Sequence, residues 1–144
     1  MSGYQHILIA VDLSQDSETV ARRGQELAGR YNAKLSFLHV VEFIPVDPAG
    51  EALLPPPLDM EGELVQGAHQ RLDSLCAKLG LQKATRRVEV GNIKAEILRV
   101  TAEEHADLLV LGSRGRHGLA LLLGSTEKSI LHKAPCDVLA VRLN

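Results

Sequence analysis

Short, nearly continuous runs of apolar residues recur along the chain. Four of them are rich in Ile, Leu and Val, and they span Ile7 to Val11, Leu35 to Val41, Leu108 to Leu111 and Val138 to Val141. Continuous apolar runs of this length predict strands that are covered on both faces. A weaker run, Arg86 to Val90, alternates polar and apolar residues, so we place it near an edge of the sheet.

Helical patterns separate these runs. Small or apolar residues recur every three or four positions in Ser17 to Tyr31, Glu61 to Leu79, Ile93 to Glu104 and Ser125 to Lys133. Asp16 or Ser14 is placed to cap the first helix, and Asn32, Gly80 and Pro135 are the expected stops. We interpret Glu103 and Glu104 as a solvated helix end.

Strands and helices therefore alternate as β-α-β-α-β-α-β-α-β. This order predicts an α/β fold: an open five-stranded parallel sheet with helices on both faces, Rossmann-like, in a single domain over residues 1–144. In such sheets ligands bind beyond the carboxyl ends of the strands, where the winding reverses. The loops after Val11, Val41 and Leu111 are thus the candidate sites.

The segment from Glu42 to Leu58 breaks the alternation. It holds five of the six prolines and cannot form a regular element. A long irregular loop after the second strand is either a lid over the ligand site or a surface connection.

The composition of the chain limits the classes of molecule that it could bind. Hydrophobic residues make up 45% of the chain and charged residues 24%, with a formal net charge of -2. This balance favours neither nucleic acid nor anionic lipid, and 3% aromatic residues without Trp argue against base stacking. The N-terminus lacks a secretory signal and no apolar run is long enough to span a bilayer, so we expect a cytoplasmic protein without membrane contact.

The residues that suggest chemistry lie after the fourth strand. Gly112 and Gly115 open a glycine-rich loop, and Gly124, Ser125 and Thr126 then begin a helix. Glycines let a ligand approach the main chain, and free N–H groups at a helix start favour phosphate. Arg116 adds positive charge nearby. From composition alone, the same residues equally fit a simple turn followed by a helix cap.

Four segments resemble the universal stress protein family, and together they cover nearly the whole chain. They are His6 to Ser14, Ala33 to Val40, Asp107 to Gly112 and Ala134 to Arg142. The resemblance implies a fold similar to the adenine nucleotide alpha hydrolases. It also implies a regulatory or stress-protective module that binds adenine nucleotide and forms a homodimer through its last strand.

Family members that bind ATP carry the motif Gly-x2-Gly-x9-Gly-(Ser/Thr). Here Gly112 and Gly115 match, but eight residues rather than nine separate Gly115 from Gly124. A shortened loop weakens a triphosphate site, so the implied ligand is ATP or, in its place, ADP or AMP, with or without Mg²⁺. No Cys or His cluster has metal-ligand spacing, so no structural metal is expected.

Carried over position by position, the resemblance assigns parts of a nucleotide site. Ala10 and Leu111 would line the base pocket, Asp12 would meet the ribose or adenine, and Val40 would face the adenine through its main chain. The implied nucleotide-binding residues are Ala10, Asp12, Val40, Leu111, Gly112, Gly115, Arg116, Gly124, Ser125 and Thr126.

Other functions remain open at this point. A slow ATPase would depend on His117 as a base, and enzymatic activity stays undecided. A protein acting only through partner contacts is the alternative that the shortened motif allows. A phosphorylation-dependent receiver is disfavoured because Asp12 has no acidic neighbour, and FMN binding because the loop after the first strand is acidic and lacks glycine. His39, inside an apolar strand, is predicted to be a hydrogen-bonded core residue.

Overall fold

The computed structural model describes residues 3–42, 58–113 and 124–143. Strands and helices alternate through them as the sequence predicts. In chain order they are β1 (His6–Ala10), α1 (Ser17–Tyr31), β2 (Lys34–Val41), α2 (Leu58–Lys78), β3 (Thr85–Val90), α3 (Ile93–Glu103), β4 (Leu108–Ser113), α4 (Gly124–Lys133) and β5 (Asp137–Arg142).

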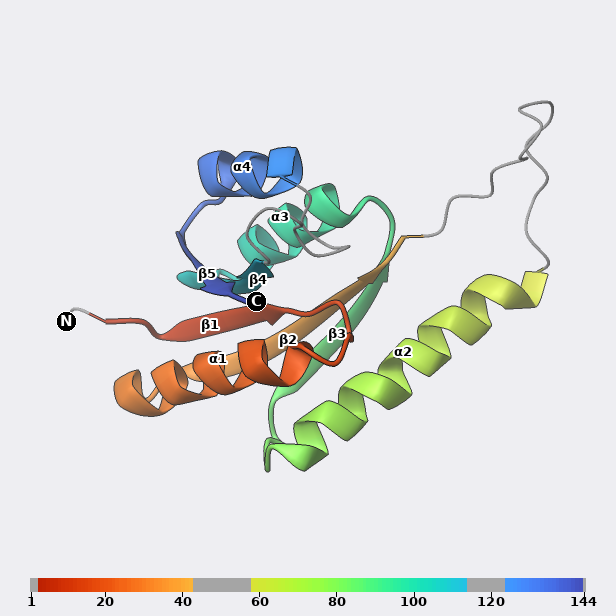
Figure 1. The fold of residues 1–144 in the computed structure, drawn as a ribbon, viewed down its shortest axis with the longest axis horizontal. Helices are drawn as coiled ribbons and strands as arrows, with labels where there is room; N and C mark the ends of the chain where they lie inside the picture. The colour runs from red at the N-terminus through yellow and green to blue at the C-terminus, as the bar shows by residue number, and fades with distance from the viewer. Residues whose placement is uncertain (1–2, 43–57, 114–123, 144) are drawn as a thin grey trace.

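The strands form one parallel sheet in the order β3-β2-β1-β4-β5. Helices α1 and α2 cover one face, and α3 and α4 cover the other (Figure 1). This arrangement confirms the predicted α/β fold. It also confirms that the strand with alternating residues, β3, lies at an edge, where one side of the strand has no neighbour in the sheet.

The core lies on both faces of the central strands β1 and β4. Ile9 stands opposite Phe37 on one side and Val110 on the other, and all three side chains are fully buried. A strand buried on both faces needs apolar residues at consecutive positions. This requirement explains the unbroken apolar runs in the sequence.

Helix α1 packs on β1 through small residues. Its C-terminal end follows the prediction, whereas its N-terminal end does not follow it fully. Val20 and Gly24 are buried, and the helix stops at Asn32, which has the left-handed φ of 54° that commonly ends helices. Asp16 occupies the N-cap position but makes no capping hydrogen bond with its side chain. Of the two predicted caps, the Asp16 side chain is therefore wrong. Ser14 does contact the helix start, because its Oγ accepts from Asp16 N at 3.3 Å and its main-chain carbonyl accepts from Ser17 N at 3.0 Å.

The expectation of a solvated end for α3 is also wrong for Glu104. Its side chain is 14% exposed and accepts a hydrogen bond from Arg87 of β3 at 3.2 Å. Its main-chain carbonyl lies 3.0 Å from His6 Nδ1. The carboxylate of Glu104 therefore lies beside Arg87 of β3 and His6 of β1, two residues that are distant from it in sequence.

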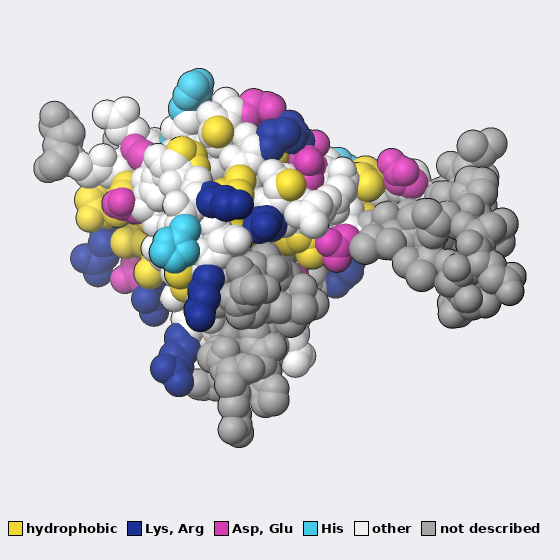
Figure 2. Space-filling view, turned by 90° about the horizontal axis from the view of Figure 1, so that it is seen from above, with side chains coloured by type: hydrophobic (Ala, Val, Ile, Leu, Met, Phe, Trp, Pro, Cys, Tyr) yellow, Lys and Arg dark blue, Asp and Glu magenta, His cyan; other side chains and the backbone are white. Residues whose placement is uncertain are grey.

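On the face formed by α3 and α4, basic side chains occur among acidic and apolar ones (Figure 2). In the part of the chain that the structure describes, no helix is both long and apolar enough to cross a bilayer.

Candidate functional site

The carboxyl ends of β1 and β4 lie side by side at the point where the sheet changes its winding direction. The chain leaves β1 towards the face covered by α1, whereas the helix that follows β4 lies on the opposite face (Figure 1). Two neighbouring strands whose connections diverge leave a crevice between them, the usual ligand position in this architecture. Ala10 and Leu111 directly follow the paired residues Ile9 and Val110, and both side chains are buried.

Asp12 follows β1 and is half-buried at the crevice. Its Oδ1 accepts hydrogen bonds from Ser14 N at 2.9 Å and from Ser17 Oγ at 3.2 Å. These bonds fix the carboxylate in the turn before α1. Within the described residues, no hydrogen bond reaches its second oxygen, Oδ2. The side chain is therefore held in place through Oδ1.

The main chain of Val40 points towards the same crevice. In a parallel strand the N–H and C=O of one residue point to the same side, and this side alternates along the chain. The main-chain groups of Leu38 point to β1, because its carbonyl oxygen accepts a hydrogen bond from Val11 N at 2.9 Å. Those of Val41 point to β3, because its carbonyl oxygen accepts from Gly91 N at 3.0 Å. Val40 therefore turns its N–H and C=O towards β1, at a level beyond the end of that strand.

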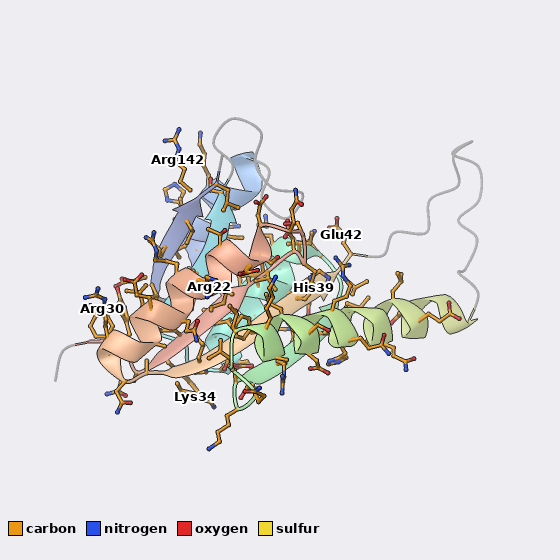
Figure 3. The ribbon with its side chains drawn as sticks, turned by 60° about the horizontal axis from the view of Figure 1, so that its bottom comes forward. Arg22, Arg30, Lys34, His39, Glu42 and Arg142 are labelled. Atoms are coloured by element: carbon orange, nitrogen blue, oxygen red, sulfur yellow. The ribbon has the colours of Figure 1, made fainter. Side chains whose placement is uncertain are left out.

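The side chain of His39 on β2 ties this strand to the residue that follows β1 (Figure 3). Its Nδ1 lies 2.8 Å from the carbonyl of Val11, close enough to donate a hydrogen bond to it. Burial lowers the pKa of His39 and outweighs the raising effect of this bond, which favours the neutral ring. The predicted hydrogen bond of this histidine is thus confirmed, but His39 is half-buried rather than a core residue. The bond ties β2 to Val11, the residue before Asp12.

The glycine-rich segment is described in part. Gly112 is buried at the end of β4, opposite Val141, and α4 begins at Gly124. Because α4 connects the parallel neighbours β4 and β5, its first turn, which contains Ser125 and Thr126, lies at the carboxyl edge of the sheet. The side chains of this turn, and the predicted contributors Gly115 and Arg116, lie outside the described residues.

A groove borders the turn that contains Asp12. It has a volume of about 510 Å³ and runs between the start of α1 and the C-terminal half of α2, and its polar lining residues are Ser14, Ser17, Gln70, Arg71, Ser74 and Lys78. The guanidinium of Arg71 donates to the carbonyl of Leu13, so α2 helps to hold the turn. Sequence reasoning missed Arg71, because nothing in a helical repeat shows that its position faces a loop 58 residues earlier.

Among residues 3–42, 58–113 and 124–143, no three His, Cys, Asp or Glu side chains are grouped as metal ligands. At the carboxyl edge the described residues bring together the fixed carboxylate of Asp12, the main-chain groups of Val40 and the start of α4.

The fold and crevice define a doubly wound α/β protein with a ligand position at its switch point. The sequence model of the universal stress protein family matches residues 3–142, and the chain belongs to this family. It is 38% identical over 138 residues to universal stress protein A homolog 1 of Coxiella burnetii, an alignment that covers 96% of each chain.

Solved structures of the family share the fold. Universal stress protein UspA from Lactobacillus plantarum matches with a TM-score of 0.72 and 26% identity, covering 99% of this chain and 100% of its own. A universal stress protein solved in complex with cAMP matches with a TM-score of 0.61 and 25% identity, over 97% of this chain and 98% of its own.

Proposed function

We propose that this protein is an adenine-nucleotide-binding module that works by holding its ligand. The observation that carries the proposal is the pairing of Asp12 with the main chain of Val40. The carboxylate keeps Oδ2 accessible, and Val40 turns its N–H and C=O to the same crevice. A carboxylate suits ribose hydroxyls, and paired main-chain groups suit the edge of a base.

The remaining parts of the crevice agree with a phosphate-bearing ligand. The first turn of α4 has free N–H groups and the positive end of the helix dipole at the carboxyl edge, where phosphate is favoured. The structural neighbour that holds cAMP supports an adenine ligand in a protein of this fold. Gly112, Gly115, Arg116, Gly124, Ser125 and Thr126 are proposed to surround the phosphates.

Which nucleotide binds depends on the loop that is one residue short of the family motif. We propose ADP or AMP alongside ATP, with Mg²⁺ bound through phosphates when ATP is present. His117, on which a slow hydrolysis would depend, lies outside the described residues. The role we propose is regulatory binding in the cytoplasm, with hydrolysis at most a minor activity.

We further propose a homodimer formed through β5. This strand lies at the edge of the sheet, beside β4 alone, and its residues Val138, Leu139 and Ala140 are only half-buried. An apolar edge strand is ready to pair with a second copy. Sedimentation equilibrium should give twice the chain mass of 15.6 kDa, and a mass of one chain across micromolar concentrations would contradict this assembly.

The nucleotide proposal is tested by calorimetric titration with ATP, ADP, AMP and cAMP. Asp12→Asn keeps an acceptor for Ser14 and Ser17 but removes the charge and replaces one oxygen by a donor. We expect it to weaken binding about tenfold or more, because hydrogen bonds to charged groups contribute roughly 1.5–3 kcal/mol.

Asp73→Asn is the matched control, because Asp73 is an exposed carboxylate on α2 that pairs with Arg86. It should leave nucleotide affinity unchanged. Absence of binding at millimolar nucleotide, or equal affinity of Asp12→Asn and the wild type, would contradict the proposed site.

A further inference from the structure

A second groove lies at the amino edge of the sheet, where the strands begin. It has a volume of about 580 Å³ and includes Tyr4, Tyr31, Asp107, Cys136 and Asp137 in its lining. These residues come from the start of β1, the end of α1, the residue before β4 and the start of β5. The sheet separates this groove from the crevice at the carboxyl edge, so it belongs to a different site.

One wall of the groove is aromatic. The rings of Tyr4 and Tyr31 pack edge to face, with centroids 5.1 Å apart and planes at 79°. Gly3 supports Tyr31 closely, because a Cβ at Gly3 would lie 2.9 Å from Tyr31 Cδ1, and its φ of 120° also disfavours a side chain. Tyr31 is nevertheless 44% exposed, so part of its ring remains accessible.

The other wall is acidic. Asp137 Oδ2 accepts the Tyr4 hydroxyl at 2.7 Å, and Asp107 accepts main-chain N–H groups of Gln5 at 2.8 Å and His6 at 3.0 Å. Across the described part of the chain, no Lys, Arg or His nitrogen comes within 4.0 Å of either carboxylate. Both carboxylates thus line the groove without a cationic partner among the described residues.

The Tyr4 hydroxyl reports this negative environment. Its hydrogen bond to Asp137, then burial, then the charges of Asp137 and Asp107 raise the pKa of Tyr4 to about 12. Arg30, in the last turn of α1, does not offset these charges by pairing, because its guanidinium contacts Glu26 at 3.3 Å (Figure 3). Other basic residues near this edge in sequence are Lys34 at the start of β2, His105 before β4, and His132 and Lys133 at the end of α4, and none of them pairs with Asp107 or Asp137 within the described residues.

The dipoles of three helices also make this edge of the sheet more negative. Tyr31 is the last residue of α1, α3 ends four residues before Asp107, and α4 ends shortly before Cys136. The carbonyl groups at the end of a helix carry a partial negative charge and favour cations. Three helix ends therefore converge on the edge that already holds two carboxylates.

We propose that this groove binds a small organic cation, one that presents a guanidinium or primary ammonium group. The cation would lie against the accessible ring of Tyr31 and pair with Asp137 through Oδ1, which no described residue contacts. The groove volume lies within the range of small-molecule sites. This site is additional to the proposed nucleotide site and does not depend on it.

Intrinsic tyrosine fluorescence gives a direct measurement. The chain has two tyrosines and no Trp, and both tyrosines line this groove, so their emission reports on it alone. Propylguanidinium is titrated at low salt against propylurea, its neutral isostere. We expect a saturable change with propylguanidinium and none with propylurea. Raising salt from about 0.05 M to about 0.5 M should weaken binding severalfold, because a shorter Debye length screens the exposed carboxylates.

Two variants separate charge recognition from a damaged groove. Asp137→Asn keeps the shape and an acceptor for Tyr4, and we expect at least fivefold weaker binding. Tyr4→Phe keeps the ring but frees Asp137 Oδ2, so binding should be equal or tighter, whereas a merely distorted groove would bind less. Glu63→Gln on α2, which removes an exposed carboxylate far from the groove, is the control for net charge and should leave binding unchanged.

The proposal is overturned by any of three results. These are the absence of a saturable fluorescence change, an equal response to propylurea, and wild-type affinity in an Asp137→Asn variant whose circular dichroism shows a folded protein. Because nucleotide binding is measured separately and at the other edge, failure here does not bear on the nucleotide proposal.

Discussion

Gly24 of α1 lies directly against Ile9 of β1, and this contact sets how closely the helix approaches the sheet. A Cβ at Gly24 would lie 2.3 Å from Ile9 Cδ1 and 2.7 Å from Ile9 Cγ1. Ile9 is fully buried, so its side chain has no open space into which it can turn. We therefore expect Gly24→Ala to push α1 away from β1, and with it the turn that holds Asp12.

The magnitude follows from two opposing effects. Overpacking a tight core typically destabilises by about 1–3 kcal/mol. Replacing glycine by alanine inside a helix gains roughly 1 kcal/mol. The net effect of Gly24→Ala should be a loss of about 1 kcal/mol in the free energy of unfolding, and at most about 2 kcal/mol. Gly29→Ala in the same helix has no atom within 4 Å of its new Cβ, so it should gain up to about 1 kcal/mol.

Urea unfolding followed by far-UV circular dichroism measures these differences. The double variant Gly24→Ala with Ile9→Val removes Cδ1, the nearer of the two clashing atoms, and keeps Cγ1. Ile9→Val alone should cost about 0.5–1.5 kcal/mol. We expect the double variant to be more stable than the sum of the single changes by about 1 kcal/mol. If Gly24→Ala were as stable as Gly29→Ala, the close approach would not constrain the helix and the reasoning would be wrong.

Two further predictions concern groups that tie β1 to its neighbours. Burial lowers the pKa of His39, so the unfolded chain binds its proton first, and stability should fall as pH drops below the ordinary histidine value of about 6.5. In His39→Asn the amide can donate to the Val11 carbonyl in place of Nδ1. Urea unfolding of this variant should show a smaller loss of unfolding free energy between neutral and mildly acidic pH. If its stability had the same pH profile as that of the wild type, His39 would be excluded as the source of the pH dependence. Asp107→Ala leaves the N–H groups of Gln5 and His6 without their acceptor, so it should lower the unfolding free energy by about 1–3 kcal/mol. Asp107→Asn keeps an acceptor and should lose less. Equal losses in the two variants would contradict the role of Asp107 as the acceptor of these N–H groups.

The sequence was sufficient for the architecture because the signals for it are local. The apolar runs at β1 and β4 are fully buried strands, and Asn32 adopts the left-handed conformation that ends a helix. Even the edge position of β3 followed from its polar alternation. In each of these cases the residue's own chemistry, or that of its near neighbours, determines the outcome.

Predictions failed where the outcome depends on residues distant in sequence. Glu104 resembles a solvated helix end until Arg87 and His6 are brought beside it by the sheet. Arg71 shows no sequence signal for its contact with the turn before α1. The edge-to-face pair of Tyr4 and Tyr31 likewise depends on a helix end meeting a strand start, and a single sequence does not reveal that meeting.

Parallel topology gives the two edges of this sheet opposite electrostatic character. Each helix returns the chain from the carboxyl edge to the amino edge, so helix starts gather where strands end and helix ends gather where strands begin. The carboxyl edge therefore suits phosphates and the amino edge suits cations. At the amino edge, the side chains of Asp107 and Asp137 strengthen the preference for cations. The two proposed sites thus share one physical origin but no residues. The two sets of titrations therefore test them separately, and an Asp12 variant that loses nucleotide should still bind propylguanidinium with unchanged affinity.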